Sequence, residues 1–221
     1  DYLTGLGINA IELMPVTEFE ANSSWGYNPS FYFAPDKYYG TKTALQHFID
    51  ECHGKGIAVI MDMVLNHSFG QSPMVQLYFE GSKPTTASPW FNVDPKHPYN
   101  VGYDFNHESA ATRYFAKNVM KFWMQQYKID GFRFDLSKGF TQKSSTDDGS
   151  FAAYDASRVA IWKDYNNHIK GIDPNNFYVI LEHFADAVEE QELANDGMML
   201  WTNLNHNMNE ATMGYLTQSD F

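Results

Sequence analysis

The chain has 221 residues, of which 43% are apolar and 19% are charged. This composition is typical of a globular protein with a sizeable core, and it excludes a disordered or collagen-like chain. The net charge of −12 argues against nucleic acid as a partner. No apolar run approaches the ~18 residues of a membrane span. The single cysteine, Cys52, excludes an internal disulfide framework and a cysteine-based zinc site.

Short apolar strand patterns alternate with helical patterns along the chain. Strands are expected at residues 8–14, 57–65, 131–136, 177–181 and 198–202. Helices are expected at residues 44–53, 110–127 and 151–169, and in a weaker stretch to about Leu216. Continuous apolar strands separated by helices predict an α/β fold with a parallel sheet covered on both faces. Right-handed crossovers then favour a doubly wound sheet or a β/α barrel.

One segment breaks this alternation. Residues 68–108 are rich in Pro, Ser, Asn and His, and they are too many for a simple strand-to-helix loop. We interpret them as an insertion after the second visible strand. The chain then divides into a first part of the sheet domain at 1–67, the insertion at 68–108, and the continuation of the sheet domain at 109–221.

Polar residues gather at the C-terminal ends of the predicted strands. They are Asp62, Asn66, His67, Arg133, Asp135 and Glu182. In parallel α/β folds these ends open onto the active site, so residues far apart in sequence are expected to meet there. A charge on a buried strand needs a partner or a function. The simpler alternative is a structural ion pair between Asp62 and Arg133 alone.

Two carboxylates on different strands suit glycoside hydrolysis, in which one attacks the anomeric carbon and the other protonates the leaving oxygen. Arg133 lies two residues before Asp135, on the same side of the strand, and would orient that carboxylate as a nucleophile. Glu182 must then carry a proton near neutral pH. Its apolar strand and the neighbouring Phe184 would supply partial desolvation for this role.

Five segments together resemble, in chain order, the motifs of the α-amylase superfamily of glycoside hydrolases (family 13). They are residues 25–29 (WGYNP), 62–67 (DMVLNH), 103–106 (YDFN), 131–135 (GFRFD) and 180–184 (ILEHF). The resemblance implies a (β/α)8 TIM barrel, of which this chain would supply about strands 2 to 6. It also implies a short B-domain insertion after strand 3, and no organic cofactor.

The resemblance implies a role for each matching residue. Asp135 matches the nucleophile, Glu182 the acid/base and Arg133 the arginine beside the nucleophile. The positions that match substrate-binding residues are Tyr27, His67, Lys138 and His183. Lys138 could instead be a solvated loop lysine, and His183 could act without touching the sugar. Asp62 matches a structural aspartate. Asn66 and Asp104 match ligands of a structural calcium, whose oxygen chemistry they suit.

The chain also departs from the family pattern. The motif Asn/Ser-His-Asp, which carries the third catalytic carboxylate, does not occur, and the closest triplet, at residues 205–207, lacks the aspartate. A first barrel strand is also missing. We therefore expect the native protein to continue on both sides of this chain, with the third aspartate outside it. Secreted, periplasmic and cytoplasmic locations are all compatible with the sequence.

The leading functional hypothesis is a retaining hydrolase of α-1,4-glucosidic bonds in starch, glycogen or maltooligosaccharides. A close alternative is a branching enzyme or transglycosylase, because residues 11–16 (IELMPV) also resemble branching and trehalose-releasing members. A non-catalytic glucan-binding barrel is a third possibility. The presence of both Asp135 and Glu182 argues against it.

Overall fold

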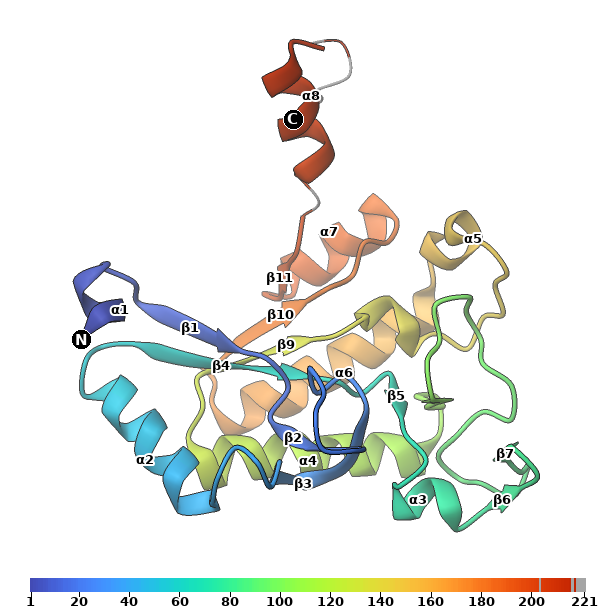
Figure 1. Cartoon of the computed structure of the whole chain (residues 1–221). Helices are drawn as coiled ribbons and strands as arrows, with labels where there is room; N and C mark the ends of the chain where they lie inside the picture. The colour runs from blue at the N-terminus through green and yellow to red at the C-terminus, as the bar shows by residue number, and fades with distance from the viewer. Residues whose placement is uncertain (203, 216, 218–221) are drawn as a thin grey trace.

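The computed structural model describes residues 1–202, 204–215 and 217. Its centre is a parallel five-stranded sheet in the order β1-β4-β9-β10-β11 (Figure 1). These strands are β1 (Ala10–Leu13), β4 (Ala58–Met63), β9 (Gly131–Phe134), β10 (Tyr178–Leu181) and β11 (Met199–Leu200). Each lies within a range expected from the sequence. Their order in space follows their order in the chain, without the reversal that defines a doubly wound sheet.

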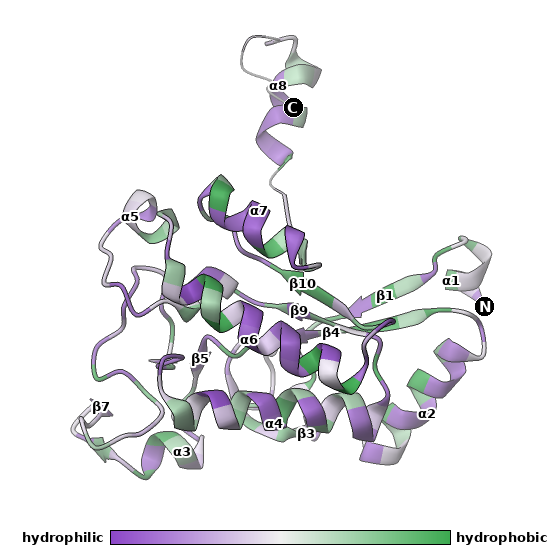
Figure 2. Cartoon of the chain, turned by 180° about the vertical axis from the view of Figure 1, so that it is seen from behind, coloured by the Kyte–Doolittle hydropathy of each residue, from purple (hydrophilic) through white to green (hydrophobic). Residues whose placement is uncertain are grey.

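Helices cover one face of this sheet. In both views, α2 (Lys42–His53), α4 (Ala110–Tyr127) and α6 (Ala156–Ile172) lie along the same side (Figures 1 and 2). The opposite face carries no helix of the described part of the chain, so the expected cover on both faces is wrong. A barrel wall has this one-sided cover, because its inner face turns toward the other strands of the barrel.

Strand alternation decides which side chains enter the core. Val59, Met61 and Met63 of β4 and Phe132 and Phe134 of β9 point toward the helices and are almost fully buried. Large side chains from α4 and α6, including Trp123 and Trp162, meet them in the same cluster. The residues between them, among them Asp62 and Arg133, point to the other face, where the polar groups gather.

Helix caps explain where the helices begin. Ser109 caps α4 by accepting from the backbone N–H of Ala111, and Asp155 caps α6 by accepting from Ser157. The single helix predicted for residues 151–169 is therefore divided into α5 (Asp148–Ala152) and α6. Asp155 is the reason, since an aspartate at this position favours a helix start over a helix interior.

The remaining elements surround the carboxyl ends of the strands. An antiparallel hairpin, β2 (Thr17–Phe19) and β3 (Pro29–Pro35), follows β1. At the two ends of the 68–108 segment, β5 (His67–Ser68) pairs with β8 (Tyr103–Asp104), so the insertion begins and ends side by side. The insertion holds only short elements, namely α3 (Pro73–Gln76), β6 (Phe79–Glu80) and β7 (Lys83–Pro84). The division at residues 67 and 108 stays a prediction.

Three further helices complete the described chain: α1 (Tyr2–Gly5), α7 (Ala187–Asn195) and α8 (Asn205–Met213). Helix α8 stands apart from the sheet (Figure 1) and corresponds to the weak helix predicted to about Leu216, although Leu216 itself lies outside the described residues. None of the helices among the described residues has the length and apolar character needed to cross a membrane.

Candidate active site

Three neighbouring strands bring the predicted catalytic residues to one end of the sheet. Asp62 on β4 and Arg133 on β9 are direct partners in the parallel register. Beyond the strands, the backbone N–H of Asp135 donates to Met63 (3.1 Å) and that of Glu182 donates to Phe134 (3.1 Å). These bonds continue the ladder past the strand ends. Asp135 and Glu182 are thus held on adjacent backbone segments.

Arg133 is the centre of the site. Its Nη1 atom donates to Asp62 Oδ1 (2.8 Å) and Asp135 Oδ1 (3.0 Å), and its Nη2 atom lies 2.9 Å from Glu182 Oε2. Burial acts to lower the pKa of Arg133, but these carboxylates outweigh it and raise that pKa above its ordinary value. The guanidinium also lies 4.3 Å from the ring centroid of Trp201, a cation–π contact.

Asp135 is fixed at both carboxylate oxygens. Oδ1 accepts from Arg133, and Oδ2 accepts from the Asn66 side chain (2.9 Å). The same Asn66 amide also donates to the backbone oxygen of Asp135 (2.9 Å). Both carboxylate partners are donors, which is what an ionised carboxylate accepts. The group is therefore oriented as a nucleophile requires.

Glu182 has one anchored and one open oxygen. Oε2 accepts from the backbone N–H of Leu136 (2.9 Å) and forms an ion pair with Arg133, whereas Oε1 makes no hydrogen bond to any described residue. The backbone of Leu136, which supplies this N–H, is left-handed, with φ of 40°, and Phe184 is left-handed as well, with φ of 49°. Such strained non-glycine residues cluster at functional sites. The Leu136 contact could not be predicted from the sequence because a backbone group makes it.

Hydrogen bonds join Asp62 to Tyr27 and Tyr27 to His67. The Tyr27 hydroxyl donates to Asp62 Oδ2 (2.7 Å), and His67 Nε2 lies 2.7 Å from the backbone oxygen of Tyr27. Gly26 makes this loop position possible: its φ is 93°, and a Cβ there would lie 2.3 Å from the carbonyl oxygen of Pro15. Burial raises the pKa of Asp62 to about 6, against the opposing effects of Arg133 and Tyr27.

Two residues with predicted sugar contacts are buried and bound to protein groups. His183 is fully buried on the helix side, with Nδ1 2.9 Å from Ser137 Oγ and Nε2 2.9 Å from Glu189 Oε1. Both ring nitrogens of the buried His183 are therefore occupied by protein partners rather than open to a sugar. Lys138 is buried rather than solvated, and its Nζ donates to Asp148 Oδ1 (3.2 Å).

The calcium site predicted at Asn66 and Asp104 stays a prediction. The Asn66 amide oxygen faces the ring of His67, and its nitrogen is bound to the nucleophile. The buried Asp104 Oδ1 atom faces His97 Nε2 at 3.8 Å, and that ring also lies against Gly139. Calcium requires about six to eight converging oxygen ligands. Among the described residues, no group of three or more His, Cys, Asp or Glu converges as metal ligands would.

The fold and the arrangement of the site together indicate the class of enzyme to which this chain belongs. Two carboxylates bound to one arginine, at the carboxyl ends of neighbouring parallel strands, are typical of the sites of β/α-barrel glycosidases. The family model described as "Alpha amylase, catalytic domain" matches residues 1–102 and 96–221. The chain therefore belongs to the α-amylase family of glycoside hydrolases (family 13), as the sequence motifs predicted.

The curated relatives have different activities. The chain is 35% identical over 137 residues to the 1,4-alpha-glucan branching enzyme GlgB of Rhodospirillum rubrum, covering 61% of this chain and 18% of that protein. It is 32% identical over 136 residues to the malto-oligosyltrehalose trehalohydrolase of Saccharolobus solfataricus, covering 61% and 23%. It is 28% identical over 201 residues to the maltogenic alpha-amylase of Bacillus acidopullulyticus, covering 85% and 31%. The chain thus spans less than a third of each of these relatives.

Solved structures show the same fold. Eubacterium rectale Amy13B superimposes with a TM-score of 0.79 at 22% identity, covering 97% of this chain and 45% of that chain. A pullulanase from Anoxybacillus sp. LM18-11, solved with maltotetraose, superimposes with a TM-score of 0.63 at 26% identity, covering 82% and 26%. The five-stranded parallel sheet therefore matches part of a larger α-amylase-family structure.

Proposed function

We propose that this chain carries the catalytic centre of a retaining α-glucan hydrolase that cleaves α-1,4-glucosidic bonds in starch, glycogen or maltooligosaccharides. The observation that carries the proposal is the Arg133 guanidinium, which binds both Asp135 and Glu182. We also propose that the sheet supplies strands 2 to 6 of a (β/α)8 barrel, with residues 68–108 as a B-domain insertion. The match to about half of a solved relative supports this.

The first step forms a glycosyl-enzyme. An Asp135 carboxylate oxygen attacks the anomeric carbon, the bond from that carbon to the glycosidic oxygen breaks, and Glu182 gives its proton to the departing oxygen. In the second step a water molecule attacks the anomeric carbon and gives its proton to the Glu182 carboxylate. The bond to Asp135 then breaks, and the enzyme returns to its starting state with the anomeric configuration retained.

The two carboxyl oxygens of Glu182 have different surroundings, which suits a group that gives up a proton and takes one back. The open Oε1 atom is the one that can hold the proton and face the glycosidic oxygen. Oε2 accepts from the Leu136 N–H and lies beside Arg133 whether the group is a carboxylate or a neutral acid, because a carbonyl-type oxygen also accepts. The anchoring is therefore kept in both steps, and Glu182 does not need to move when its proton leaves.

Transfer to a second glucan is the other candidate. The branching enzyme relative, 35% identical over 61% of this chain, favours it. The first step is unchanged. In the second, a sugar hydroxyl of the acceptor replaces water, attacks the anomeric carbon and gives its proton to Glu182. A branching enzyme would form α-1,6 links in this step, and a hydrolase would form new reducing ends.

Product analysis with the full-length protein that contains this chain separates these activities. The protein is incubated with amylose, and reducing ends and α-1,6 linkages are measured over time. A rise in reducing ends without new α-1,6 linkages supports hydrolysis. New α-1,6 linkages at a constant number of reducing ends support transfer. Glucan binding with no turnover at all would contradict both and support the non-catalytic alternative.

Substitutions assign the two roles. Asp135→Asn should lower turnover by more than about 10³-fold, as removal of a nucleophile does. Glu182→Gln should lower it by about 10²–10⁴-fold, with a smaller loss on substrates that have good leaving groups. The control is Asp94→Asn, which changes an exposed carboxylate of the insertion that pairs, among the described residues, only with Lys83. If either catalytic variant keeps more than about a tenth of wild-type turnover, its assigned role is wrong.

A further inference from the structure

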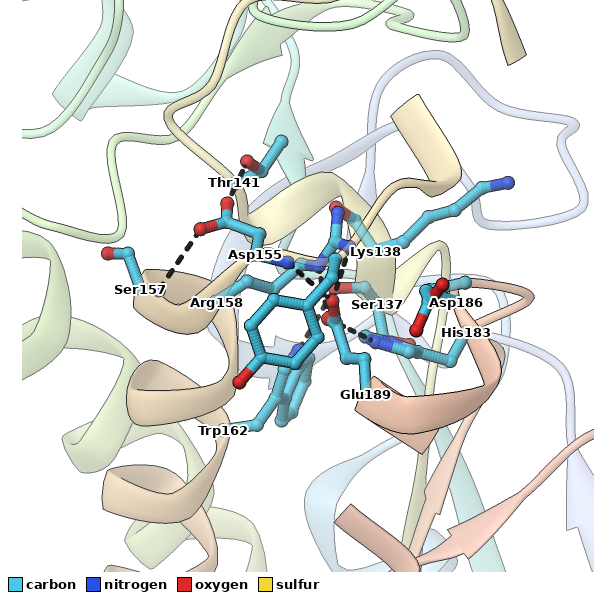
Figure 3. A network of polar contacts seen from close by, with 12 residues as sticks. Ser137, Lys138, Thr141, Asp155, Ser157, Arg158, Trp162, His183, Asp186 and Glu189 are labelled. Atoms are coloured by element: carbon cyan, nitrogen blue, oxygen red, sulfur yellow. Dashed lines mark hydrogen bonds and ion pairs between the residues drawn. The ribbon is translucent and has the colours of Figure 1, made fainter. Parts of the chain in front are cut away.

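A buried ion pair lies behind the active site, on the helix side of the sheet. Arg158 of α6 binds Glu189 of α7 through both carboxylate oxygens, with Nε to Oε1 at 2.6 Å and Nη2 to Oε2 at 2.8 Å (Figure 3). Their exposed fractions are 1% and 0%. Charges removed from water lose their hydration, so an apolar pair of similar size would often be no less stable. The stability of the helix packing is therefore a weak explanation for the burial of this pair.

Arg158 also binds backbone oxygens, one of them in the turn that follows the nucleophile. Nη1 donates to the backbone oxygens of Lys138 (3.1 Å) and Phe151 (3.2 Å). Lys138 belongs to the 3-10 turn Ser137–Phe140, which begins two residues after Asp135. Trp162 of α6 holds the same turn by donating from Nε1 to the backbone oxygen of Ser137 (3.0 Å). The nucleophile's loop is thus fixed from α6.

His183 connects the ion pair to the acid/base. Burial lowers the pKa of His183, which favours the neutral ring. Its Nε2 atom lies 2.9 Å from Glu189 Oε1, which can only accept, so the ring proton is on Nε2. Nδ1 then accepts from the Ser137 hydroxyl at 2.9 Å. His183 directly follows Glu182, and the backbone N–H of Ser137 donates to the Glu182 carbonyl (3.0 Å).

We propose that the Arg158–Glu189 pair, acting through His183 and Ser137, sets the position of Glu182 relative to Asp135. These four are positioning residues: they touch the loops that carry the two carboxylates and not the substrate. The inference rests on the proposed function, since it concerns proton transfer by Glu182. Small displacements of a proton donor are costly, because a misplacement of about 1 Å can lower a rate about 10²-fold.

The fold supplies a matched control. Lys163 and Glu192 join the same two helices, with Nζ and Oε2 3.2 Å apart and both side chains about 38% exposed. Apart from this pair, Glu192 accepts only from the exposed hydroxyl of Tyr154 among the described residues. Neither Lys163 nor Glu192 contacts the Ser137–Phe140 turn or His183. Glu192→Gln therefore removes a helix-to-helix ion pair without touching the catalytic loops.

The test compares Glu189→Gln with Glu192→Gln in the full-length protein, at a temperature where circular dichroism shows both to be folded. The values of kcat/KM are measured on a maltooligosaccharide and on α-maltosyl fluoride, whose leaving group needs little protonation. We expect Glu189→Gln to lower kcat/KM on the maltooligosaccharide by at least about tenfold and on the fluoride by less than about threefold. Glu192→Gln should change neither.

Equal losses of Glu189→Gln on both substrates, or no loss on either, would overturn the proposal and leave the pair a purely structural one. If Glu189→Gln does not fold, Ser137→Ala takes its place. It removes only the hydroxyl that donates to His183, and it should show the same substrate-selective loss. Wild-type kinetics for Ser137→Ala on both substrates would then overturn the proposal. A wild-type protein inactive on both substrates, or full activity of Asp135→Asn, would instead refute the proposed function.

Discussion

At the scale of single residues, Arg133 has three partners with different tasks. Asp62 is a buried anchor, Asp135 is the proposed nucleophile and Glu182 is the proposed acid/base. A guanidinium can serve all three because its donors are planar and fixed in direction. Lysine offers a compact charge with no such fork, so it cannot replace Arg133 without loosening at least one carboxylate.

The hydroxyl of Tyr27 gives a prediction for pH dependence. Burial raises the pKa of Asp62 to about 6, and the hydrogen bond from Tyr27 opposes that rise. Below about pH 6, Asp62 takes up a proton and its ion pair with Arg133 weakens. We therefore expect kcat/KM to fall on the acid side of about pH 6. In Tyr27→Phe this fall should begin at higher pH, and activity at neutral pH should drop about five- to tenfold, the effect of one lost hydrogen bond.

The measurement is a pH profile of kcat/KM for wild type, Tyr27→Phe and Tyr27→Ala. The alanine variant loses the ring as well and should be the least active. Tyr154→Phe is the control, because the Tyr154 hydroxyl bonds only to Glu192 on the surface among the described residues. A Tyr27→Phe profile that coincides with the wild-type profile would show that only the ring matters.

Glu189 gives a prediction for stability. Burial acts to raise the pKa of Glu189, but the contacts with His183 and Arg158 outweigh it and lower that pKa from 4.5 to about 2. A depressed carboxyl pKa stabilises the folded state above the unfolded pKa and loses this effect as pH falls. The contribution of Glu189 is therefore complete above about pH 4.5 and disappears toward pH 2.

Urea denaturation of the full-length protein measures how the stabilising contribution of Glu189 changes with pH. The stability difference between wild type and Glu189→Gln should be largest near neutral pH and should shrink when both are measured at about pH 3. Glu192→Gln, with its exposed pair, should differ little from wild type at either pH. If the stability difference between wild type and Glu189→Gln became larger as the pH is lowered, the lowered pKa assigned to Glu189 would be wrong.

At the scale of elements, periodicity predicted most of the sheet and its helices. Strand β4 and helix α4 were found because their apolar spacing is regular. The β2–β3 hairpin was missed, since its register shifts break the alternation that identifies a strand. The division between α5 and α6 was missed because the cap at Asp155 lies inside a continuous helical pattern.

The same reasoning explains which parts of the site could be predicted. Asp135, Glu182 and Arg133 are polar groups at the ends of apolar strands, which is a strong signal. The buried direction of His183 required the structure, because residues beyond a strand end do not have to keep its alternation. Trp201 was missed as a partner of Arg133 because a lone tryptophan after a short strand has no distinguishing pattern.

Gly131 provides a prediction for the centre of the sheet. A Cβ at this position would lie 2.6 Å from Ile60 Cδ1 and 2.8 Å from Tyr178 Cβ, on the two neighbouring strands. Gly131→Ala should therefore push β9 away from β4 and β10 and lower the free energy of unfolding by about 1–3 kcal/mol, as overpacking does. Chemical denaturation of the full-length protein measures this loss.

Gly171→Ala is the control for Gly131→Ala. Gly171 lies near the end of α6, and no atom within 4 Å would meet its added Cβ. Alanine there should be neutral or slightly stabilising, because glycine is a poor helix former. Two variants of equal stability would show that the strands around Gly131 move apart freely.

At the scale of the whole molecule, one face of the sheet has no cover among the described residues. Met14, Tyr178 and Met199 are each about half exposed, with exposed fractions of 48%, 48% and 51%. In the described chain, β1 and β11 each pair with a neighbour on one side only. A solved relative that matches this chain closely in fold is more than twice as long.

Expression of residues 1–221 alone tests what this open face means. A barrel becomes stable when its first and last strands pair, and unpaired edges beside exposed apolar side chains favour aggregation. We expect this segment on its own to be poorly soluble, to melt without cooperativity and to be inactive on amylose. Sedimentation, a thermal melt followed by circular dichroism and a reducing-end assay measure the three properties. A soluble and amylolytic preparation of residues 1–221 with a cooperative melt would show that this five-stranded sheet is a self-sufficient unit.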